Sequence, residues 1–346
     1  MAQSENPPGA IRLIELGKTP FWRTQAVYHA VAELMTAASP DTIIICRPAT
    51  PYLCLGYHQV YDAVLDRAAC QRLNLPVMRR RVGGGATYLD ANQLFYQCVF
   101  HHRRVPLAAK DIYAFLLAAP VAALRRLGLD ARLRAVNEVE AEGRRIAGVG
   151  GGRSGEAAVV VGNLLFDFDY EVMAQVWRVP GEPFRELAAA ALRERLITLR
   201  QALGDGVSVA AARQILLEEF ARALGRPLRP GALTPAETRR AAELAQRMRS
   251  PEYLNLHADM AVVDGRIPPM NALKIAAGVY VKWVETVWRG RPVQAALRAR
   301  DGIIEAARFQ PAAGDWSGVE ASLRGVPFAE WAARLEAAGA AAEAMA

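Results

Sequence analysis

The chain has 346 residues, 52% apolar and 22% charged, with a formal net charge of +7. This composition excludes a disordered or fibrous chain and suits one large domain with a smaller one. Its basic residues are spread along the sequence, no apolar run approaches the roughly 18 residues of a membrane span, and no signal peptide is evident, so we expect a cytoplasmic protein that binds neither nucleic acid nor membranes.

Apolar spacing and strand-forming runs predict the elements of the first half of the chain. The expected helices are 22–36, 60–74 and 110–127, and the expected strands are 42–46, 52–56, 77–82 and 93–101. Only a turn with Pro48 and Pro51 separates the first two strands, so they should form a hairpin. Pro120 should kink the helix around it or divide it into two helices.

The second half should contain a strand, a helical region and a small α+β appendage. Residues 158–168 are rich in valine and leucine, and the segment from Pro183 to about Gly225 has helical spacing. Thr234 followed by Pro235 and Glu237 is a helix start signal, and that helix should run to about Arg249. Strands are expected over 279–288 and 302–309, before an alanine-rich terminal helix.

Several familiar motifs are excluded by their context. Residues 150–155 satisfy G-x-G-x-x-G, but a strand and not a helix follows, which argues against dinucleotide binding. The histidines have no metal-binding spacing, and His101 and His102 should be exposed residues at a strand end. The four cysteines have no C-x-x-C spacing, so they should be reduced and mostly buried.

The segment Arg79–Asp90 stands out, since it reads RRRVGGGATYLD between two strand patterns. Three glycines allow unusual backbone angles and bring bare N–H groups against an anion. Adjacent arginines supply charge-assisted bonds to phosphate or carboxylate. The alternative is a glycine-rich turn beside a solvated arginine cluster.

This segment resembles the motif R-R-x-S-G-G-G-A-V-Y-H-D of lipoate–protein ligases, which share the biotin/lipoate ligase fold. Three more blocks match that family in order: Leu55–Gln59 (LGYHQ), Asn137–Val139 with Gly143–Gly148 (NEV and GRRIAG), and Gly162–Asp167 (GNLLFD). Lys274, the 279–288 strand and Leu323–Phe328 resemble the accessory domain of long-form ligases. The resemblance covers nearly the whole chain.

The resemblance implies a fold, a reaction and a domain plan. The fold would be α/β (α+β), a biotin/lipoate-ligase-like catalytic domain with a mixed sheet and packed helices, plus a small C-terminal α+β domain. The catalytic domain would span 1–230, a helical connector 231–255 and the accessory domain 256–346. Such enzymes activate lipoate or octanoate with ATP as an acyl-adenylate. They then transfer the acyl group to a lysine of a lipoyl-domain protein, of the glycine cleavage H or dehydrogenase E2 type.

The resemblance also assigns the site residues. Arg145 would be catalytic, and the residues binding acyl substrate and ATP would be Arg80, Gly83, Gly84, Gly85, Ala86, Thr87, Tyr88, Asn137, Gly148, Gly162 and His58. Mg²⁺ is expected to arrive with ATP, since no metal-ligand pattern is present in the sequence. The glycine motif and the Arg145 segment should face each other across one pocket.

The chain departs from the family at four positions. Arg145 stands where the family has its essential lysine, while Val82, Leu89 and Val161 replace a serine and two histidines. Arginine keeps the positive charge of lysine, but its guanidinium group is larger and planar, so the exchange is not conservative. With Arg145 at this position, three alternatives remain for the protein. It would be a variant ligase in which Arg145 does the work of the lysine, a member with an unusual acceptor protein, or a protein that binds the ligand without full turnover.

A second reaction type remains open. Octanoyl or lipoyl transferases share the fold but form a thioester on a cysteine, which must be exposed and activated. In the family their cysteine lies between the glycine motif and the G-R-K-I block, whereas residues 99–145 contain none. Cys98 precedes that interval, but it lies in a strand expected to be buried. A biotin ligase is disfavoured because its G-R-G-R-x-G loop is absent.

Overall fold

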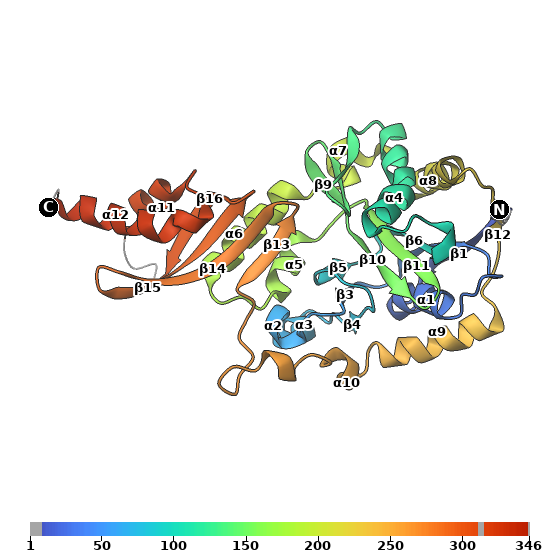
Figure 1. The fold of residues 1–346 in the computed structure, drawn as a ribbon, viewed down its shortest axis with the longest axis horizontal. Coiled ribbons are helices and arrows are strands. Elements are labelled where there is room, and N and C mark those ends of the chain that lie inside the picture. The colour runs from blue at the N-terminus through green and yellow to red at the C-terminus, as the bar shows by residue number, and fades with distance from the viewer. Residues whose placement is uncertain (1–8, 311–314, 345–346) are drawn as a thin grey trace, which may run out of the picture. The chain divides into compact units, whose positions relative to one another are not determined.

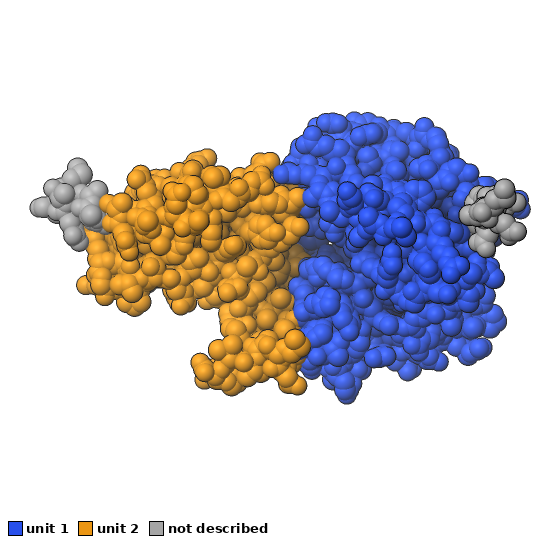
Figure 2. All heavy atoms as spheres, in the orientation of Figure 1, with its two compact units in different colours: residues 1–59, 70–169, 197–257 blue, residues 60–69, 170–196, 258–346 orange. Residues whose placement is uncertain are grey.

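The computed structural model describes residues 9–310 and 315–344, which form two compact units. Unit 1 holds the chain up to residue 59, residues 70–169 and residues 197–257. Unit 2 holds residues 60–69, 170–196 and the chain from residue 258 onward (Figure 2). Each unit is therefore assembled from segments that are distant in the sequence.

A mixed six-stranded sheet forms the centre of unit 1 (Figure 1). In order across the sheet, its strands are β10 (Val149–Ser154), β11 (Ala157–Leu165), β6 (Gln93–His101), β2 (Thr42–Pro48), β1 (Ile11–Thr19) and β12 (Leu228–Pro230). Strand β1 runs parallel to β2 and β12, and the other neighbouring pairs are antiparallel. The predicted mixed sheet is confirmed.

Helices cover both faces of this sheet. Helices α4 (Ala109–Arg126) and α8 (Val209–Leu224) share one core cluster with Ile43, whereas α1 (Phe21–Glu33) and α9 (Pro235–Arg247) share another with Ile44. Successive side chains of β2 thus point into different layers. Because both layers are apolar, β2 is a continuous apolar run without alternation.

The predicted hairpin between residues 42–46 and 52–56 is wrong. Strand β3 (Tyr52–Leu55) leaves the central sheet and joins a separate one, between β4 (Val77–Arg79) and β5 (Thr87–Leu89). It runs parallel to β4 and antiparallel to β5. All of β3 is buried, and partners from later in the chain satisfy both of its edges, which the local turn signal does not reveal.

Other predicted elements have different limits in the structure. The expected helix 60–74 is divided into α2 (Tyr61–Val64) and α3 (Arg67–Arg72), because Leu65 is extended and bridges to Trp177. Helix α4 continues through Pro120 without a break. The helical region after Pro183 consists of α6 (Glu182–Arg195), α7 (Leu199–Leu203) and α8.

Of three predictions about local features, one is wrong and two are confirmed. His101 is only 2% exposed, because its ring contacts Glu156 and its backbone N–H donates to Asp41, so the expectation of an exposed residue is wrong. The start of α9 is confirmed, since Thr234 and Glu237 cap each other's backbone N–H groups. All four cysteines are free and buried, as expected.

The remaining elements of unit 1 are a small sheet, a short helix and two 3₁₀ turns. A second three-stranded antiparallel sheet contains β7 (Ala131–Arg134), β8 (Glu138–Ala141) and β9 (Arg144–Ala147). Helix α10 (Pro251–Leu254) lies near the end of unit 1, and the 3₁₀ turns of this unit are His102–Arg104 and Gly204–Gly206. The segment expected as a connector, 231–255, belongs to unit 1.

Unit 2 is a small α+β unit built on an antiparallel sheet. Its strands, in order, are β13 (Ala272–Ala276), β14 (Val279–Trp288), β15 (Arg291–Arg300) and β16 (Ile303–Gln310). Its helices include α5 (Tyr170–Val176), α6, α11 (Ser317–Leu323) and α12 (Trp331–Ala344), with 3₁₀ turns at Asp259–Ala261 and Phe328–Glu330. The β15 residue Leu297 shares a core cluster with α11 and α12, whereas Arg298 pairs with Glu194 of α6, so the helices cover opposite faces.

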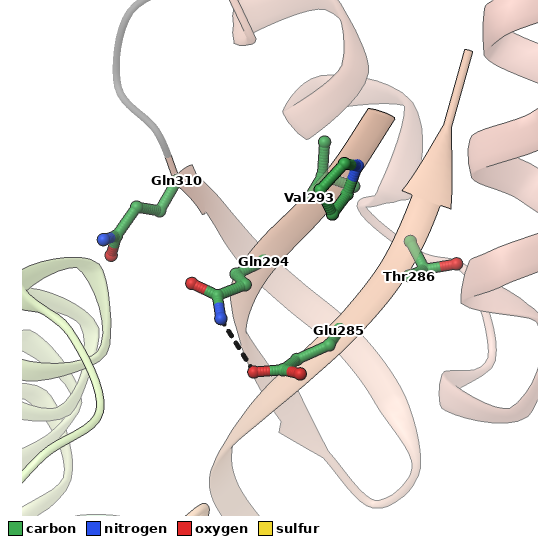
Figure 3. A pocket seen from close by; sticks show the side chains of 6 residues that line it. Glu285, Thr286, Val293, Gln294 and Gln310 are labelled. Carbon is green, nitrogen blue, oxygen red and sulfur yellow. Dashed lines mark hydrogen bonds between the residues drawn. The ribbon is translucent and has the colours of Figure 1, made fainter. Parts of the chain in front are cut away.

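A cavity of about 510 Å³ lies in unit 2 at the end of the β14–β15 hairpin (Figure 3). It is lined by Glu285, Thr286, Pro292, Val293, Gln294 and Gln310. Gln294 Nε2 donates to Glu285 Oε1 at 2.7 Å across this surface. None of the site residues expected from the sequence lines this cavity.

The structure confirms the α/β class with a mixed sheet and a small C-terminal unit. In the described residues no helix is long and apolar enough to span a membrane.

Candidate active site

The loop that joins β4 to β5 is held from inside by the Arg80 guanidinium. Arg80 is 9% exposed, and its Nη2 donates to Gly83 O at 2.8 Å and to Gly85 O at 2.9 Å. Its Nε also donates to Gly83 O, and its Nη1 donates to Cys54 O at 3.1 Å. Four of these hydrogen bonds go to backbone carbonyls, three of them in the glycine loop, so Arg80 determines the shape of that loop.

This arrangement orients backbone donors outward. A trans peptide is planar, so the N–H of Gly84 points away from the Gly83 carbonyl that Arg80 binds, and the N–H of Ala86 points away from the Gly85 carbonyl. Among the described residues, neither N–H has a hydrogen-bond partner, and Gly84 and Gly85 are exposed. Two free N–H groups from alternate residues, beside a guanidinium, offer donors to an anion.

Two glycines make this loop possible. Gly84 has a φ of +100°, which disfavours any side chain, and a Cβ there would lie 2.7 Å from Arg80 Nη2. Gly56 follows β3, and a Cβ on it would lie 1.8 Å from Gly84 O. Sequence analysis quoted Gly56 within a motif block but did not place it in the site, because only the three-dimensional structure shows the close approach.

Replacing Gly56 by alanine should displace the glycine loop and destabilise the protein by about 1–3 kcal/mol, the usual cost of overpacking. The new methyl group would meet backbone atoms, which cannot rotate away. Urea unfolding measures the loss. Gly83→Ala is the matched control, since a Cβ there meets nothing within 4 Å. Equal stability of the two variants would contradict the loop geometry.

Arg145 lies near the same loop. Its Nε donates to Ala147 O at 3.2 Å. Burial lowers the pKa of Arg145, the carboxylate of Glu138 raises it, and the positive charge of Arg80 lowers it further. The electrostatic interaction with Arg80 indicates that the two predicted arginines lie in the same region of unit 1, and the Glu138 carboxylate partly offsets their positive charge.

A chain of buried amides joins the two motifs. Gly148 N–H donates to Asn163 Oδ1 at 2.7 Å, and Asn163 Nδ2 donates to Gln93 Oε1 at 2.7 Å. Gln93 Nε2 in turn donates to Tyr88 O at 3.1 Å. The end of the Arg145 block is thus tied through β11 and β6 to the end of the glycine motif. Sequence analysis missed Asn163 and Gln93, although a polar residue within the apolar β11 run was an available signal.

Strands β10 and β11 support the loop from one side. A Cβ on Gly150 would lie 3.6 Å from Gly83 O and 3.7 Å from Val82 Cγ2. Gly162 pairs with Tyr96, and a Cβ on Gly162 would lie 2.3 Å from the Tyr96 hydroxyl. The predicted residue Gly162 therefore has a packing role, because it makes room for the buried Tyr96 ring.

The end of the glycine motif lies on β5. Tyr88 is 6% exposed, and its ring meets Phe168 edge-on at 6.0 Å. Burial raises the pKa of Tyr88, and so does the charge of Asp90, so its phenol stays neutral. Ala86 and Thr87 are half-buried.

Two predicted residues lie apart from this group. Asn137 is exposed in the turn between β7 and β8. His58 is exposed, and its ring stacks on that of His257 at 6.1 Å, with Tyr57 edge-on at 4.9 Å. Neither makes a hydrogen bond to the glycine loop within the described chain. The structure therefore brings together Arg80, the glycines, Tyr88, Arg145 and Gly148, but not these two.

The site holds no activated thiol. Cys54 is closest, because its Sγ accepts from Arg80 Nη1 at 3.7 Å, but burial raises its pKa despite that contact. Burial also raises the pKa of Cys98 and raises that of Cys46 to about 12. In residues 9–310 and 315–344 no cluster of three histidine, cysteine or acidic side chains could hold a metal ion.

Comparisons with known proteins give one consistent family. A model of the lipoyl protein ligase A/B catalytic domain matches residues 22–221. The octanoyltransferase LipM of Kyrpidia tusciae is 27% identical over 266 residues, 70% of this chain and 97% of that protein. Lipoate-protein ligase A subunit 1 of Thermoplasma acidophilum is 28% identical over 212 residues, 58% of this chain and 79% of that protein. A solved bipartite lipoate protein ligase from T. acidophilum, described with its E2 lipoyl domain, has a TM-score of 0.66 at 26% identity and covers 72% of this chain and 98% of its own.

Proposed function

Because this chain belongs to the family of lipoyl protein ligase A/B catalytic domains, we propose that it is a lipoate–protein ligase that forms an acyl-adenylate. The family resemblance carried by the four motif blocks is confirmed. In the proposed reaction, a carboxylate oxygen of lipoate or octanoate attacks the α-phosphorus of ATP and pyrophosphate leaves. A lysine amine of the acceptor then attacks the acyl carbonyl, and AMP leaves.

The observation that carries this proposal is the group of outward N–H donors beside two guanidiniums. Attack of one anion on another concentrates negative charge, so the site needs fixed donors and positive charge. The N–H groups of Gly84 and Ala86 would bind phosphate oxygens, and Arg80 would hold those donors in place. Arg145 would bridge the carboxylate and the α-phosphate.

These residues fit a nucleotide with its metal ion. Mg²⁺ keeps several water ligands and binds phosphate oxygens with one or two carboxylates, so it needs no protein cage. The metal would neutralise the phosphate charge, while Arg145 and the loop would orient the reacting groups.

The acceptor would be a lipoyl domain. The similar ligase of T. acidophilum is described with its E2 lipoyl domain, which supports an acceptor of this kind here. We assign adenylation to unit 1, which contains all the predicted site residues, and an accessory role to unit 2.

A cysteine transferase is the second candidate, and the similarity to LipM of K. tusciae favours it. A thioester route needs an accessible thiolate. All four cysteines are at most 2% exposed, and the pKa values of Cys46, Cys54 and Cys98 are raised. The burial and the raised pKa values of these thiols argue against a thioester route and so favour the ligase.

The decisive experiment is to measure pyrophosphate release by the full chain with ATP and lipoate or octanoate. A ligase should release pyrophosphate only when both substrates are present, and mass spectrometry should identify the acyl-adenylate. Tight binding of the acid without adenylate would overturn the proposal and favour a ligand-binding relative.

The Cys54→Ala and Cys98→Ala variants should retain the wild-type rate to within about twofold, since neither thiol takes part in adenylate chemistry. The readout is acyl transfer to a lipoyl domain. An octanoyl group that stays on either cysteine after denaturation, together with loss of transfer in the matching variant, would establish the transferase instead.

A further inference from the structure

Arg79, the residue before Arg80, is a completely buried arginine with an unusual set of partners. It is 0% exposed, and its hydrogen bonds in the described chain all go to backbone carbonyl oxygens. Its Nε donates to Tyr253 O at 2.8 Å, and its Nη2 donates to Leu254 O. Its Nη1 donates to the carbonyls of Gly56, Tyr57 and Gln59.

These partners come from two separate segments. One is the 56–59 loop after β3, whose first residue lies directly beneath Gly84. The other is the 248–254 segment, which ends with α10 and also accepts the Arg79 backbone N–H at Met248 O, 3.0 Å away. The Arg79 guanidinium therefore links both segments, through hydrogen bonds, to the start of the glycine loop.

We call the contact of Arg79 with the 56–59 loop and the 248–254 segment the junction. Because the Arg79 guanidinium is charged and buried, it needs the carbonyl acceptors of both segments. A buried guanidinium without a carboxylate partner is costly, and only aligned carbonyl dipoles offset the lost hydration. The carbonyls of Tyr253 and Leu254 lie at the C-terminal end of α10, a single helical turn, and both accept from the guanidinium. Without the 248–254 segment, two carbonyl acceptors for the side chain would be missing.

We propose that Arg79 is a positioning residue. Through its hydrogen bonds, the conformation of the glycine loop that binds ligand depends on packing of the 248–254 segment against Arg79. The effect passes through the 56–59 loop, because Gly56 can lie against Gly84 only while the Gly56 carbonyl is held. This inference rests on the proposed function only where it calls Gly84 and Ala86 ligand donors. The junction itself can be tested without any ligand.

The first experiment is hydrogen exchange of the full chain without ligand, comparing wild type with Arg79→Lys. Lysine keeps the charge but has a single ammonium group, which cannot reach carbonyls on both sides as the guanidinium fork does. Exchange should rise at least tenfold in both 56–59 and 250–255, and stay unchanged in β6. A rise in one segment alone, or an equal rise everywhere, would overturn the proposal.

The second experiment weakens the 248–254 segment itself and leaves Arg79 unchanged. The Ser250 hydroxyl caps α10 by accepting from Tyr253 N–H at 3.3 Å, and the Thr234 hydroxyl caps α9 by accepting from Glu237 N–H at 3.1 Å. Ser250→Ala should weaken binding of octanoyl-sulfamoyl-adenosine, a non-hydrolysable adenylate, by about fivefold, the typical size of a cap loss. Thr234→Ala removes a similar cap away from the junction and should leave binding unchanged.

The outcomes separate this inference from the proposed function. If wild type does not bind the analogue, the adenylate proposal fails while the exchange experiment still decides the role of Arg79. If wild type binds and the two cap variants weaken binding equally, the positioning role is wrong. Non-additive losses in Arg79→Lys combined with Ser250→Ala would support it, since coupled residues fail to add.

Discussion

Replacing Arg145 by alanine should lower the rate of acyl-adenylate formation by about 10²–10³, the usual effect of removing one charged donor from a preorganised site. Arg145 is half-buried, and burial and the positive charge of Arg80 both lower its pKa, so two positive charges lie close together here. Neighbouring positive charges of this kind are suited to stabilise an anion. Lipoate-dependent pyrophosphate release by wild type and variant measures the effect.

Two neighbouring changes serve as controls for Arg145. Arg145→Lys introduces the residue that the family resemblance implies at this position, and it should hold or raise the rate. Arg144→Ala should be tolerated, because successive residues of β9 point to opposite faces. Small and equal effects of alanine at both positions would show that Arg145 is only a surface charge.

Replacing Arg80 by alanine should weaken binding of the non-hydrolysable adenylate by about 30- to 1000-fold. The expected loss is about 2–4 kcal/mol, because charge-assisted hydrogen bonds contribute about 1.5–3 kcal/mol each and Arg80 makes several. The carbonyls of Gly83 and Gly85 would turn toward water, and the N–H groups on the opposite side of those peptides would turn with them. Titration calorimetry measures this loss.

Arg81→Ala is the matched control for Arg80. Its side chain pairs with Glu33 on α1, and its backbone N–H, which donates to His29 Nε2 at 3.1 Å, is kept by alanine. Binding should therefore change by less than about threefold, as expected for a partly exposed ion pair. A loss as large as that in Arg80→Ala would mean that general positive charge, and not loop shape, determines affinity.

The comparison of Arg80 and Arg145 refines the roles expected from the resemblance. The resemblance implies that both arginines contact the ligand, whereas Arg80 donates its hydrogen bonds to Gly83 and Gly85 of the loop and to Cys54 of β3. We therefore propose that Arg80 acts through the backbone donors and that Arg145 acts directly. The two experiments separate these roles, because Arg80→Ala should reduce binding and Arg145→Ala should reduce mainly the rate.

Local patterns in the sequence were sufficient for most of the elements and for the family. The cap formed by Thr234 and Glu237, the β11 run and the glycine motif are each encoded within a few residues, so their physics can be recognised without a fold. The four motif blocks identified the family, whose catalytic-domain model matches residues 22–221.

Only the tertiary structure decided which of these segments meet. Strand β3 pairs with β4 and β5 and not with β2, and Gly56 lies against Gly84, because burial of both faces of β3 outweighs the nearby turn signal. The amides of Asn163 and Gln93, and the carbonyls around Arg79, gain their roles only when distant strands supply the partner. A hydrogen bond between residues far apart in sequence leaves no local periodicity, so the sequence determined the parts of the site and the fold determined their geometry.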